Sequence, residues 1–470
     1  MRRAAWALAL AWPLALAAEI PAPVRAALTR AAVPESAVAI VVQPADGPRP
    51  SVAHNAAVPM NPASVMKIVT AYAALDLLGP AFTFKTDLLV TGELAGGILA
   101  GDVVLRGGGD PKLTYEKLWQ VAHQLRARGV REIRGDVILD RGYFALPPHD
   151  PAKFDNDPRR AYNVGADALL VNFQAVDFRF VPEASGLRIT AEPDLPNLQV
   201  LSRVALTAEP CGSWRRNLKH EVEARGLIAT VVFSGSMPSA CGERSWPLSV
   251  LDGAAFTEST LRWLWSEAGG VLRGKVRAGP TPLDARLLYR HESEPLANLV
   301  RDMNKFSNNV MARHLFLALS ADRSAPGEAA ASARIVRDWL RGRGLEAADL
   351  VLENGSGLSR GERTSAATLT AILRDAWASA LMPEMVASFP IYGVDGTLRT
   401  RRGQGAVGEA HLKGGTLADV QAIAGYVVDQ QGRRWITVMI VNHAHAGAAQ
   451  PALDALVEWV HAQGRRKGTP

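Results

Sequence analysis

The chain contains a serine and a lysine three residues apart in a segment expected to be helical. Ser64 and Lys67 enclose two apolar residues, and an apolar run follows as far as residue 78. Positions i and i+3 of a helix share one face, so the hydroxyl and the amine should be neighbours. A hydroxyl beside a base, near a helix start with unpaired backbone N–H groups, suits acyl transfer. For this motif alone, a surface serine and lysine on an amphipathic helix is the alternative.

Two further polar motifs occur far along the chain. Ser307 and Asn309, with one asparagine between them, separate two expected helices, where such side chains often only cap a helix. Lys413 is followed by two glycines and Thr416, and period-two spacing places Lys413 and Gly415 on one face of a strand. Each motif alone is weak. In the order S-x-x-K, S-x-N and K-x-G, on helix, loop and strand, they predict the site of a serine acyl-transfer enzyme.

Helices and strands at both ends of the chain must bring these motifs together. Asn61 is expected to cap the first helix, with Pro62 at its first position and a Gly-Pro pair at 79–80 ending it. Residue patterns predict strands at 37–43, 411–416, 422–428 and 435–442, and helices at 296–305, 310–319, 329–341 and 451–463. Strands at both ends with helices between them indicate one α/β domain whose sheet joins the two termini.

The middle of the chain has a different character. Within residues 84–285, short strand-like pieces alternate with Gly and Pro turns, at 102–106, 136–140, 187–191 and 228–233, and one amphipathic helix lies near 115–128. This pattern predicts a β-rich insertion into a domain made of residues 18–83 and 286–470. The glycines at 107–109 could suggest a phosphate loop, but no Gly-Lys-Ser/Thr follows, so a structural turn is predicted.

Length, composition and charge limit the possible classes of protein. A chain of 470 residues exceeds one compact core, so two or three domains are expected. A hydrophobic content of 48% with 21% charged residues is typical of a globular protein. The net charge of +6 is dilute and forms no basic stripe, which argues against nucleic-acid binding. No His or Cys cluster has ligand spacing, so neither a metal nor another cofactor is expected.

The N-terminal segment predicts export. Two arginines precede an apolar run at 4–14, and small residues at 15 and 17 offer a cleavage site, so residues 1–17 are predicted to be a signal peptide. The run is too short to span a bilayer, so a periplasmic protein without a transmembrane anchor is expected, a retained anchor being the alternative. Cys211 and Cys241 allow one internal pairing, and an oxidising compartment favours a disulfide over two buried free thiols.

On its three motifs the chain resembles the class C low-molecular-mass penicillin-binding proteins, which are D-alanyl-D-alanine carboxypeptidases and endopeptidases. Supporting segments extend over most of the chain, at 107–111, 162–163, 167–170, 241–243, 353–360, 393–398 and 424–426. The resemblance implies an α/β (α+β) penicillin-binding transpeptidase-like domain, with an antiparallel sheet flanked by helices. It also implies that the insertion forms two domains, one (104–167) nested within the other (84–103 and 168–285). Peptidoglycan stem peptides and cross-links are the implied substrates, and β-lactams the implied inhibitors.

The resemblance assigns a role to each motif residue. Ser64 would attack the carbonyl between two D-alanines, and Lys67 would be its base, since burial and the charge of Lys413 favour an uncharged amine. Ser307 would pass the proton to the leaving amine, and Asn309 would orient Lys67 and the substrate. Lys413 would supply positive potential.

The same resemblance places the oxyanion between two backbone N–H groups, those of Ser64 and Thr416, with Gly415 beside them. Family members usually have Thr or Ser between the motif lysine and glycine, where the hydroxyl helps to hold the terminal carboxylate, but this chain has Gly414. Losing one hydrogen bond to a charged group costs about 1.5–3 kcal/mol, so weaker carboxypeptidase recognition is expected. Asp157 corresponds to an acidic residue that binds the free amino-acid end of the peptide side chain, a solvated loop carboxylate being the alternative.

Two other functions stay open. The chain could be a wall-binding homologue of the same fold in which Gly414 marks weakened catalysis, although the intact Ser64, Lys67, Ser307 and Asn309 argue against this. It could also be a β-lactamase or an esterase that uses the same motifs, although the long insertion argues against that.

Overall fold

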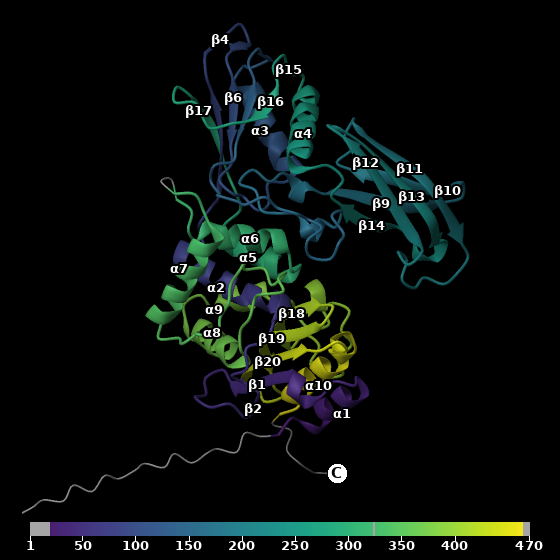
Figure 1. The fold of residues 1–470 in the computed structure, drawn as a ribbon, viewed down its shortest axis with the longest axis vertical. Helices are drawn as coiled ribbons and strands as arrows, with labels where there is room; N and C mark the ends of the chain where they lie inside the picture. Colours follow the sequence, from purple (N-terminus) through teal and green to yellow (C-terminus); the bar gives the residue numbers. More distant parts are fainter. Residues whose placement is uncertain (1–18, 323–324, 464–470) are drawn as a thin grey trace, which may run out of the picture.

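The computed structural model describes residues 19–322 and 325–463. The predicted signal segment at 1–17 therefore lies outside the described residues. Among the helices of the described residues, none is long and apolar enough to cross a membrane. Three parts are visible in Figure 1: an α/β body built from both ends of the chain (19–84, 293–322 and 325–463), a first lobe (85–143 and 253–292) and a second lobe (176–248).

A five-stranded antiparallel sheet forms the centre of the body, in the order β18-β19-β20-β1-β2. Its strands are Ala410–Leu417 (β18), Val420–Val428 (β19), Arg434–Asn442 (β20), Val38–Pro44 (β1) and Val52–His54 (β2). Strand β1 from one end of the chain pairs with β20 from the other, from Val38 opposite Val441 to Pro44 opposite Trp435. The predicted sheet that joins both ends of the chain is confirmed.

Both faces of this sheet are covered by helices. Along β1, Ala39 and Val41 belong to one core, whereas Val38, Ile40 and Val42 belong to the other, as the alternation of a strand requires. The core of the first face includes residues of α2 (Lys67–Leu78), α5 (Leu296–Lys305), α6 (Asn309–Ala318), α7 (Ala329–Gly342), α8 (Ala366–Ala378) and α9 (Met382–Ser388). That of the second face includes residues of α1 (Ala22–Arg30) and α10 (Gln450–His461).

The helix that carries Lys67 begins later than predicted. A 3₁₀ turn, η2 (Ala63–Met66), precedes α2, and Pro62 lies before the turn instead of at the first helical position. Ala63 has a φ of 47°, in the left-handed region, so the chain cannot enter the helix at Pro62. Asn61 still acts at this end, because its Oδ1 accepts a hydrogen bond from the Ala63 N–H at 2.9 Å. The helix ends at Leu78, before Gly79, as predicted.

The first lobe combines two sheets with two helices. One sheet has the order β16-β8-β6-β3-β17 and the other β15-β7-β5-β4. Their strands are Lys85–Val90 (β3), Glu93–Ala95 (β4), Ile98–Ala100 (β5), Val103–Arg106 (β6), Glu132–Ile133 (β7), Val137–Asp140 (β8), Val271–Leu272 (β15), Val276–Ala278 (β16) and Arg286–Glu292 (β17). Helix α3 (Tyr115–Ala127) connects the parallel pair β6 and β8 and packs against α4 (Gly253–Glu267).

The second lobe consists of two three-stranded sheets, in the orders β10-β9-β14 and β11-β13-β12. Their strands are Val176–Glu183 (β9), Gly186–Glu192 (β10), Leu198–Thr207 (β11), Leu218–Arg225 (β12), Ile228–Pro238 (β13) and Arg244–Leu248 (β14). Phe178, Phe180 and Phe233 are fully buried between them, with ring centroids 5.0 Å apart in edge-to-face pairs.

One sheet of the insertion includes strands from both of its predicted domains. Strands β6 and β8 fall almost wholly within the expected nested domain, 104–167, and they belong to one sheet with β3, β16 and β17. In Figure 1 the segment 176–248 stands to one side of this sheet. The expected boundary between residues 103 and 104 therefore cuts through a strand, because pairing between strands distant in sequence leaves no local signal at a boundary.

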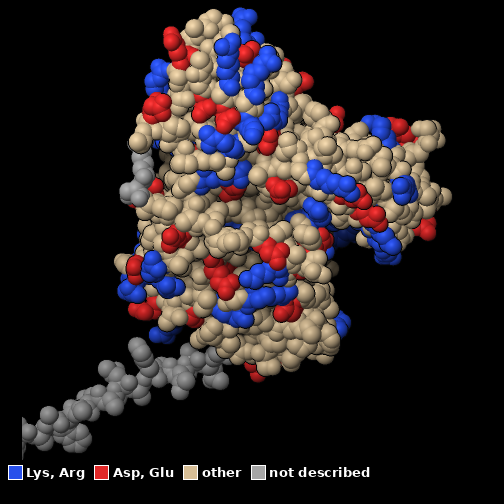
Figure 2. Space-filling model, turned by 45° about the horizontal axis from the view of Figure 1, so that its top comes forward, with Lys and Arg blue, Asp and Glu red and all other residues tan. Residues whose placement is uncertain are grey.

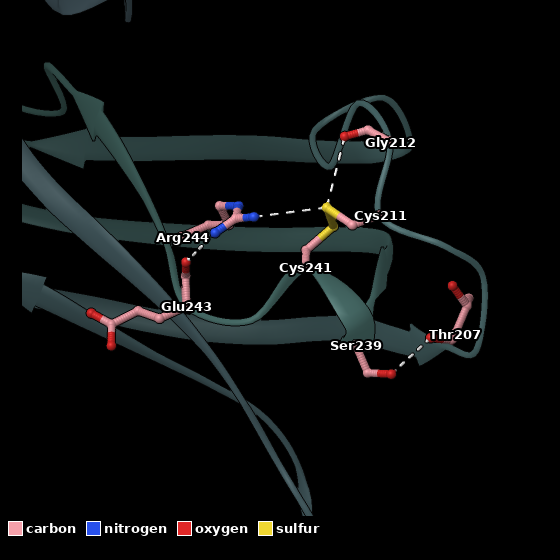
Figure 3. The surroundings of a disulfide bond; sticks show 7 residues. All are labelled: Thr207, Cys211, Gly212, Ser239, Cys241, Glu243 and Arg244. Atoms are coloured by element: carbon pink, nitrogen blue, oxygen red, sulfur yellow. Dashed lines mark hydrogen bonds between the residues drawn. A yellow bond between two sulfur atoms is a disulfide. The ribbon is translucent and has the colours of Figure 1, made fainter. Parts of the chain in front are cut away.

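A disulfide joins the two sheets of the second lobe. Cys211 lies in the loop between β11 and β12, and Cys241 lies between β13 and β14, with Cα atoms 4.7 Å apart (Figure 3). Nearby, the Ser239 hydroxyl donates a hydrogen bond to the Thr207 carbonyl at 3.1 Å. The predicted disulfide is confirmed, and it fixes the loop before β12 to the start of β14.

Removing this disulfide should destabilise the second lobe. Replacing both cysteines by serine releases a closed loop of 30 residues, which lowers the free energy of unfolding by about 3–4 kcal/mol in the chain-entropy model. The ring centroids of Trp214 and Trp246 lie 6.2 Å apart in this lobe. Tryptophan fluorescence during denaturant unfolding therefore reports the lower stability of the lobe. Reductant should lower the midpoint of the wild type and leave that of the double variant unchanged. Equal midpoints for the two proteins in the absence of reductant would contradict the prediction.

Candidate functional site

The three sequence motifs meet around the amine of Lys67. Its Nζ lies 3.0 Å from Ser64 Oγ and 2.7 Å from Asn309 Oδ1, and it also bonds the Ser356 carbonyl oxygen. Lys67 is fully buried at 0% exposure, whereas Ser64 is only partly covered. The accessible hydroxyl of Ser64 therefore contacts the buried amine of Lys67, as the i, i+3 spacing predicts.

The third motif reaches the same place along β18. The Nζ of Lys413 lies 2.8 Å from Ser307 Oγ and 2.7 Å from the Gly414 carbonyl oxygen. A Cβ atom built on Gly415 would lie 3.0 Å from the Ser64 nitrogen and 2.6 Å from the Pro62 oxygen. Only glycine allows the strand to approach the start of the Ser64 turn so closely. Residues 64, 309 and 413 thus belong to one cluster, and a strand edge lies beside the Ser64 N–H.

Burial favours the neutral form of both lysines, and at Lys67 a nearby positive charge adds to it. Burial is the largest effect on Lys67, and the nearby charge of Lys413 adds to it, so the pKa of Lys67 falls well below 10.5. Burial alone lowers the pKa of Lys413 to about 7. Glu362 acts in the opposite direction on Lys67, but its effect is smaller. The site therefore favours an uncharged amine at Lys67.

The number of donors on a neutral amine explains the geometry at Lys67. A neutral amine has two N–H donors and one lone pair, and the oxygens of Asn309 and Ser356 can only accept hydrogen bonds. With both donors directed at these oxygens, the lone pair is left for the Ser64 hydroxyl, which then donates its proton across the 3.0 Å separation. In this arrangement the amine of Lys67 can accept a proton from the Ser64 hydroxyl.

Two residues of this network were missed in the sequence. The Ser356 carbonyl belongs to the loop 353–360, which was noted only as a supporting segment. Glu362 shapes that loop: its Oε1 accepts from the backbone N–H groups of residues 353, 354 and 355, and its Oε2 accepts from that of residue 357. Glu362 is fully buried. A backbone acceptor leaves no residue-type signal, although a glutamate directly after a loop rich in Gly and Ser could have indicated the support.

Asp157 lies at a distance from this cluster but borders the same cleft. A cleft of about 710 Å³ is lined by Ser307 and Asn309 from the body and by Asp157, Trp246 and others from the insertion. The Asp157 carboxylate accepts a hydrogen bond from Arg160 Nε at 2.7 Å. The structure thus brings Asp157 to the cleft as an ion-paired residue, without contact to Lys67.

The remaining predicted positions lie along β18 or in the second lobe. Thr416 is exposed, and its hydroxyl donates to Gln421 at 3.3 Å. Gly414 has room beside it, since a Cβ atom there would have only Leu398 Cδ2 within contact, at 3.6 Å. Cys211 and Cys241 form the disulfide of the second lobe. In the part of the chain that the structure describes, no group of three or more His, Cys, Asp or Glu side chains could hold a metal ion.

The surface charge has no single sign on the face shown in Figure 2, where basic and acidic side chains are interspersed. This distribution agrees with the dilute net charge of +6. Long-range attraction of a polyanion is therefore not a feature of this face.

Known proteins resemble the chain in both sequence and fold. The D-alanyl-D-alanine carboxypeptidase of Actinomadura sp. (strain R39) is 31% identical over 410 residues, which cover 84% of this chain and 75% of that protein. D-alanyl-D-alanine carboxypeptidase DacB of Haemophilus influenzae is 26% identical, with 84% and 83% covered. The crystal structure of penicillin binding protein 4 (dacB) from Haemophilus influenzae superposes with a TM-score of 0.76 at 24% identity, covering 93% of this chain and 98% of that one.

A more distant structural likeness involves an endopeptidase. The penicillin G acylated Bd3459 predatory endopeptidase from Bdellovibrio bacteriovorus has a TM-score of 0.53 at 14% identity, with 91% and 93% of the two chains covered. These likenesses confirm the predicted fold class. The model of the D-Ala-D-Ala carboxypeptidase 3 (S13) family matches residues 21–463. On this match and on the identity to the Actinomadura enzyme, the chain belongs to the D-Ala-D-Ala carboxypeptidase 3 (S13) family.

Proposed function

We propose that the protein is a serine D-Ala-D-Ala carboxypeptidase and endopeptidase that acts on peptidoglycan peptides through an acyl-enzyme on Ser64. The observation that carries this proposal is the pairing of a partly exposed hydroxyl with a buried amine whose pKa is strongly lowered. The names of the sequence relatives support the substrate class, since two of them are D-alanyl-D-alanine carboxypeptidases.

In the first step, Ser64 Oγ forms a bond to the carbonyl carbon between the two D-alanines while its proton moves to Lys67 Nζ. The oxyanion would be held by the backbone N–H groups of Ser64 and Thr416, a role supported by the close approach of β18 to Ser64 at Gly415. The charge of Lys413 favours the same oxyanion.

The C–N bond then breaks, and the leaving amine needs a proton. Ser307 is suited to relay it, because its hydroxyl lies 2.8 Å from Lys413 Nζ and lines the cleft with Asn309. Asn309 holds Lys67 in place through its Oδ1. Water next attacks the acyl-enzyme, with Lys67 again as base, which releases the shortened peptide and the free Ser64 hydroxyl.

The cleft between the body and the insertion offers room for the peptide side chain. We assign Asp157 to the binding of a cationic amine there, since its carboxylate borders the cleft that contains Ser307 and Asn309. A location in the bacterial periplasm or another extracellular space follows from a peptidoglycan substrate, and the disulfide is in keeping with an oxidising compartment. β-Lactams would acylate the same serine.

Replacing Ser64 by alanine tests the nucleophile directly. The variant should lose covalent labelling by a fluorescent penicillin completely, and its D-Ala release from a pentapeptide should fall by at least about a thousand-fold, since the attacking oxygen is gone. Mass spectrometry should place the penicilloyl adduct of the wild type on the peptide that contains residue 64. Ser359, which donates to Glu353 in the neighbouring loop, provides the control: Ser359→Ala should still be labelled.

The outcomes of this experiment also separate the alternatives. Absence of labelling in both wild type and Ser64→Ala would favour a wall-binding homologue. Rapid turnover of penicillin without D-Ala release from wall peptides would favour a β-lactamase.

The two buried lysines should give acylation a bell-shaped pH dependence. As pH rises, Lys67 loses its proton at a pKa well below 10.5 and becomes a base, so the second-order rate constant rises. Lys413 loses its positive charge above its pKa of about 7, so the rate constant should fall again on the alkaline side. In Lys413→Arg the charge persists, and the alkaline limb should move to higher pH. The exposed control Lys219→Arg should reproduce the wild-type profile, and identical profiles for all three proteins would contradict the assignment.

Gly414 should limit recognition of a terminal carboxylate. Gly414→Thr places a hydroxyl on the strand edge, where only Leu398 lies within contact of the new Cβ atom. One added hydrogen bond to a carboxylate corresponds to about 1.5–3 kcal/mol, so kcat/KM for a peptide ending in D-Ala-D-Ala should rise about tenfold or more. Gly414→Ala adds the Cβ atom without the hydroxyl and should stay near wild type. Equal values for the Thr and Ala variants would sink this prediction.

A further inference from the structure

The Ser307 motif forms the corner between two helices. Ser307 has a φ of 55° and follows the end of α5. The Asn308 N–H donates to the Met303 carbonyl at 3.0 Å, and Asn308 Oδ1 accepts from the Met311 N–H, also at 3.0 Å. The corner is thus bonded to the last turn of α5 and the first turn of α6. The positions of the Ser307 hydroxyl and the Asn309 amide therefore depend on how these two helices are held.

The insertion holds α6 through both nitrogens of a buried histidine. His314 Nδ1 donates to the Gly109 carbonyl at 2.9 Å, and the Asp167 N–H donates to His314 Nε2 at 3.3 Å. A ring that donates at one nitrogen and accepts at the other is neutral. Burial agrees with this, since it lowers the pKa of His314 to about 4. On the same helix, Arg313 donates to the Val164 carbonyl at 2.6 Å.

The same insertion loop holds α5 through an ion pair. Lys112 Nζ lies 2.6 Å from Asp302 Oδ2 on α5 and 3.1 Å from Glu294 Oε1 just before that helix. The backbone of Lys112 is itself fixed, because its N–H donates to Asp110 Oδ1 at 2.8 Å. Asp302 precedes the Ser307 corner by five residues, and His314 follows Asn309 by five. The loop thus holds one helix on each side of the corner.

Three consecutive glycines fit this loop tightly between its neighbours. A Cβ atom on Gly107 would lie 2.2 Å from the Ala168 oxygen, and one on Gly108 would lie 2.1 Å from the Lys85 oxygen. At Gly109, whose φ is +79°, the Cβ atom would meet the Phe144 ring at 2.5 Å. The loop therefore has no freedom to shift toward these groups. In Figure 1, α5 and α6 lie at the top of the body, where the insertion meets it.

We propose that the loop 107–112 of the insertion is a clamp that sets the geometry of the Ser307–Asn309 corner, with His314 and Lys112 as positioning residues that act through α6 and α5. This inference rests on the proposed function, because it takes the corner to be part of the acylation machinery. Neither residue touches the substrate. The insertion would thus contribute to the acylation step itself, in addition to lining the cleft.

Stopped-flow acylation by a fluorescent penicillin tests the clamp, because it separates the rate constant at saturating penicillin from the dissociation constant of the non-covalent complex. In His314→Leu, the bond to Gly109 is lost and Asn309 moves relative to Lys67, so the rate constant should fall about ten- to a hundred-fold, as expected for a misplaced catalytic group. The dissociation constant should change less than about twofold, since the cleft surface is intact.

The control is a histidine that makes the same kind of bond elsewhere. His461 Nδ1 lies 2.7 Å from the Val428 carbonyl oxygen, at the end of α10, so His461→Leu should lower the melting temperature without changing the acylation rate constant. On the other helix, Lys112→Met should slow acylation, and Lys112→Arg, which preserves the ion pair, should restore it.

The possible results separate the two proposals. Wild-type protein that is not acylated would contradict the proposed function. If the wild type is acylated, two results would overturn the clamp alone. The first is an acylation rate constant in His314→Leu that is no lower than in His461→Leu. The second is equal acylation rate constants in Lys112→Met and Lys112→Arg.

Discussion

The buried amine of Lys67 is the constraint on which the site depends. An amine removed from water must find hydrogen-bond partners inside the protein, because an unpaired polar group in the interior costs free energy. Its partners come from three separate segments, at Ser64, Asn309 and Ser356, of which the last two lie 242 and 289 residues away in sequence. The helix α2, the corner before α6 and the loop supported by Glu362 must therefore all be in place before Lys67 is satisfied.

The long insertion interrupts the domain without separating the two halves of its site, because the two ends of the insertion lie together. The insertion begins with β3 and ends with β17, and these strands pair, with Lys85 opposite Glu292. The first and last strands of the insertion therefore lie side by side, so the end of α2 and the start of α5 remain close to each other in the body. The insertion then returns to the body through Lys112 and His314, so the element that interrupts the sequence also supports the corner that completes the site.

The sequence predicts contacts between residues that are close together in the chain, but it does not predict contacts between distant segments. Ser64 and Lys67 stand one turn apart, so their contact could be derived from helical periodicity alone. The order of the sheet strands could be derived only in part, since the continuous apolar run at 38–42 indicates burial on both faces but not the partner strand. Helix α4 was missed because Thr257 and Thr260 weaken its helical pattern; their hydroxyls bond the carbonyls of Gly253 and Phe256 one turn earlier. The division of the insertion stays a prediction, because the pairing that joins β6 and β8 with β3 and β16 in one sheet leaves no local pattern in the sequence.

The two adjacent glycines of β18 differ in whether the packing around them allows a side chain. At Gly415 a side chain would collide with Pro62 and the Ser64 nitrogen, so the close approach of β18 to Ser64 requires glycine. At Gly414 the space is free, with Leu398 at ordinary contact distance, so nothing in the packing excludes a hydroxyl-bearing residue. Under the proposed function, the absence of a hydroxyl there would remove a group for holding a substrate carboxylate, while Ser64, Lys67 and the strand edge keep their places. Under the proposed function, attack by Ser64 and recognition of the terminal carboxylate would thus be separable on this strand, with Gly414 affecting only the second.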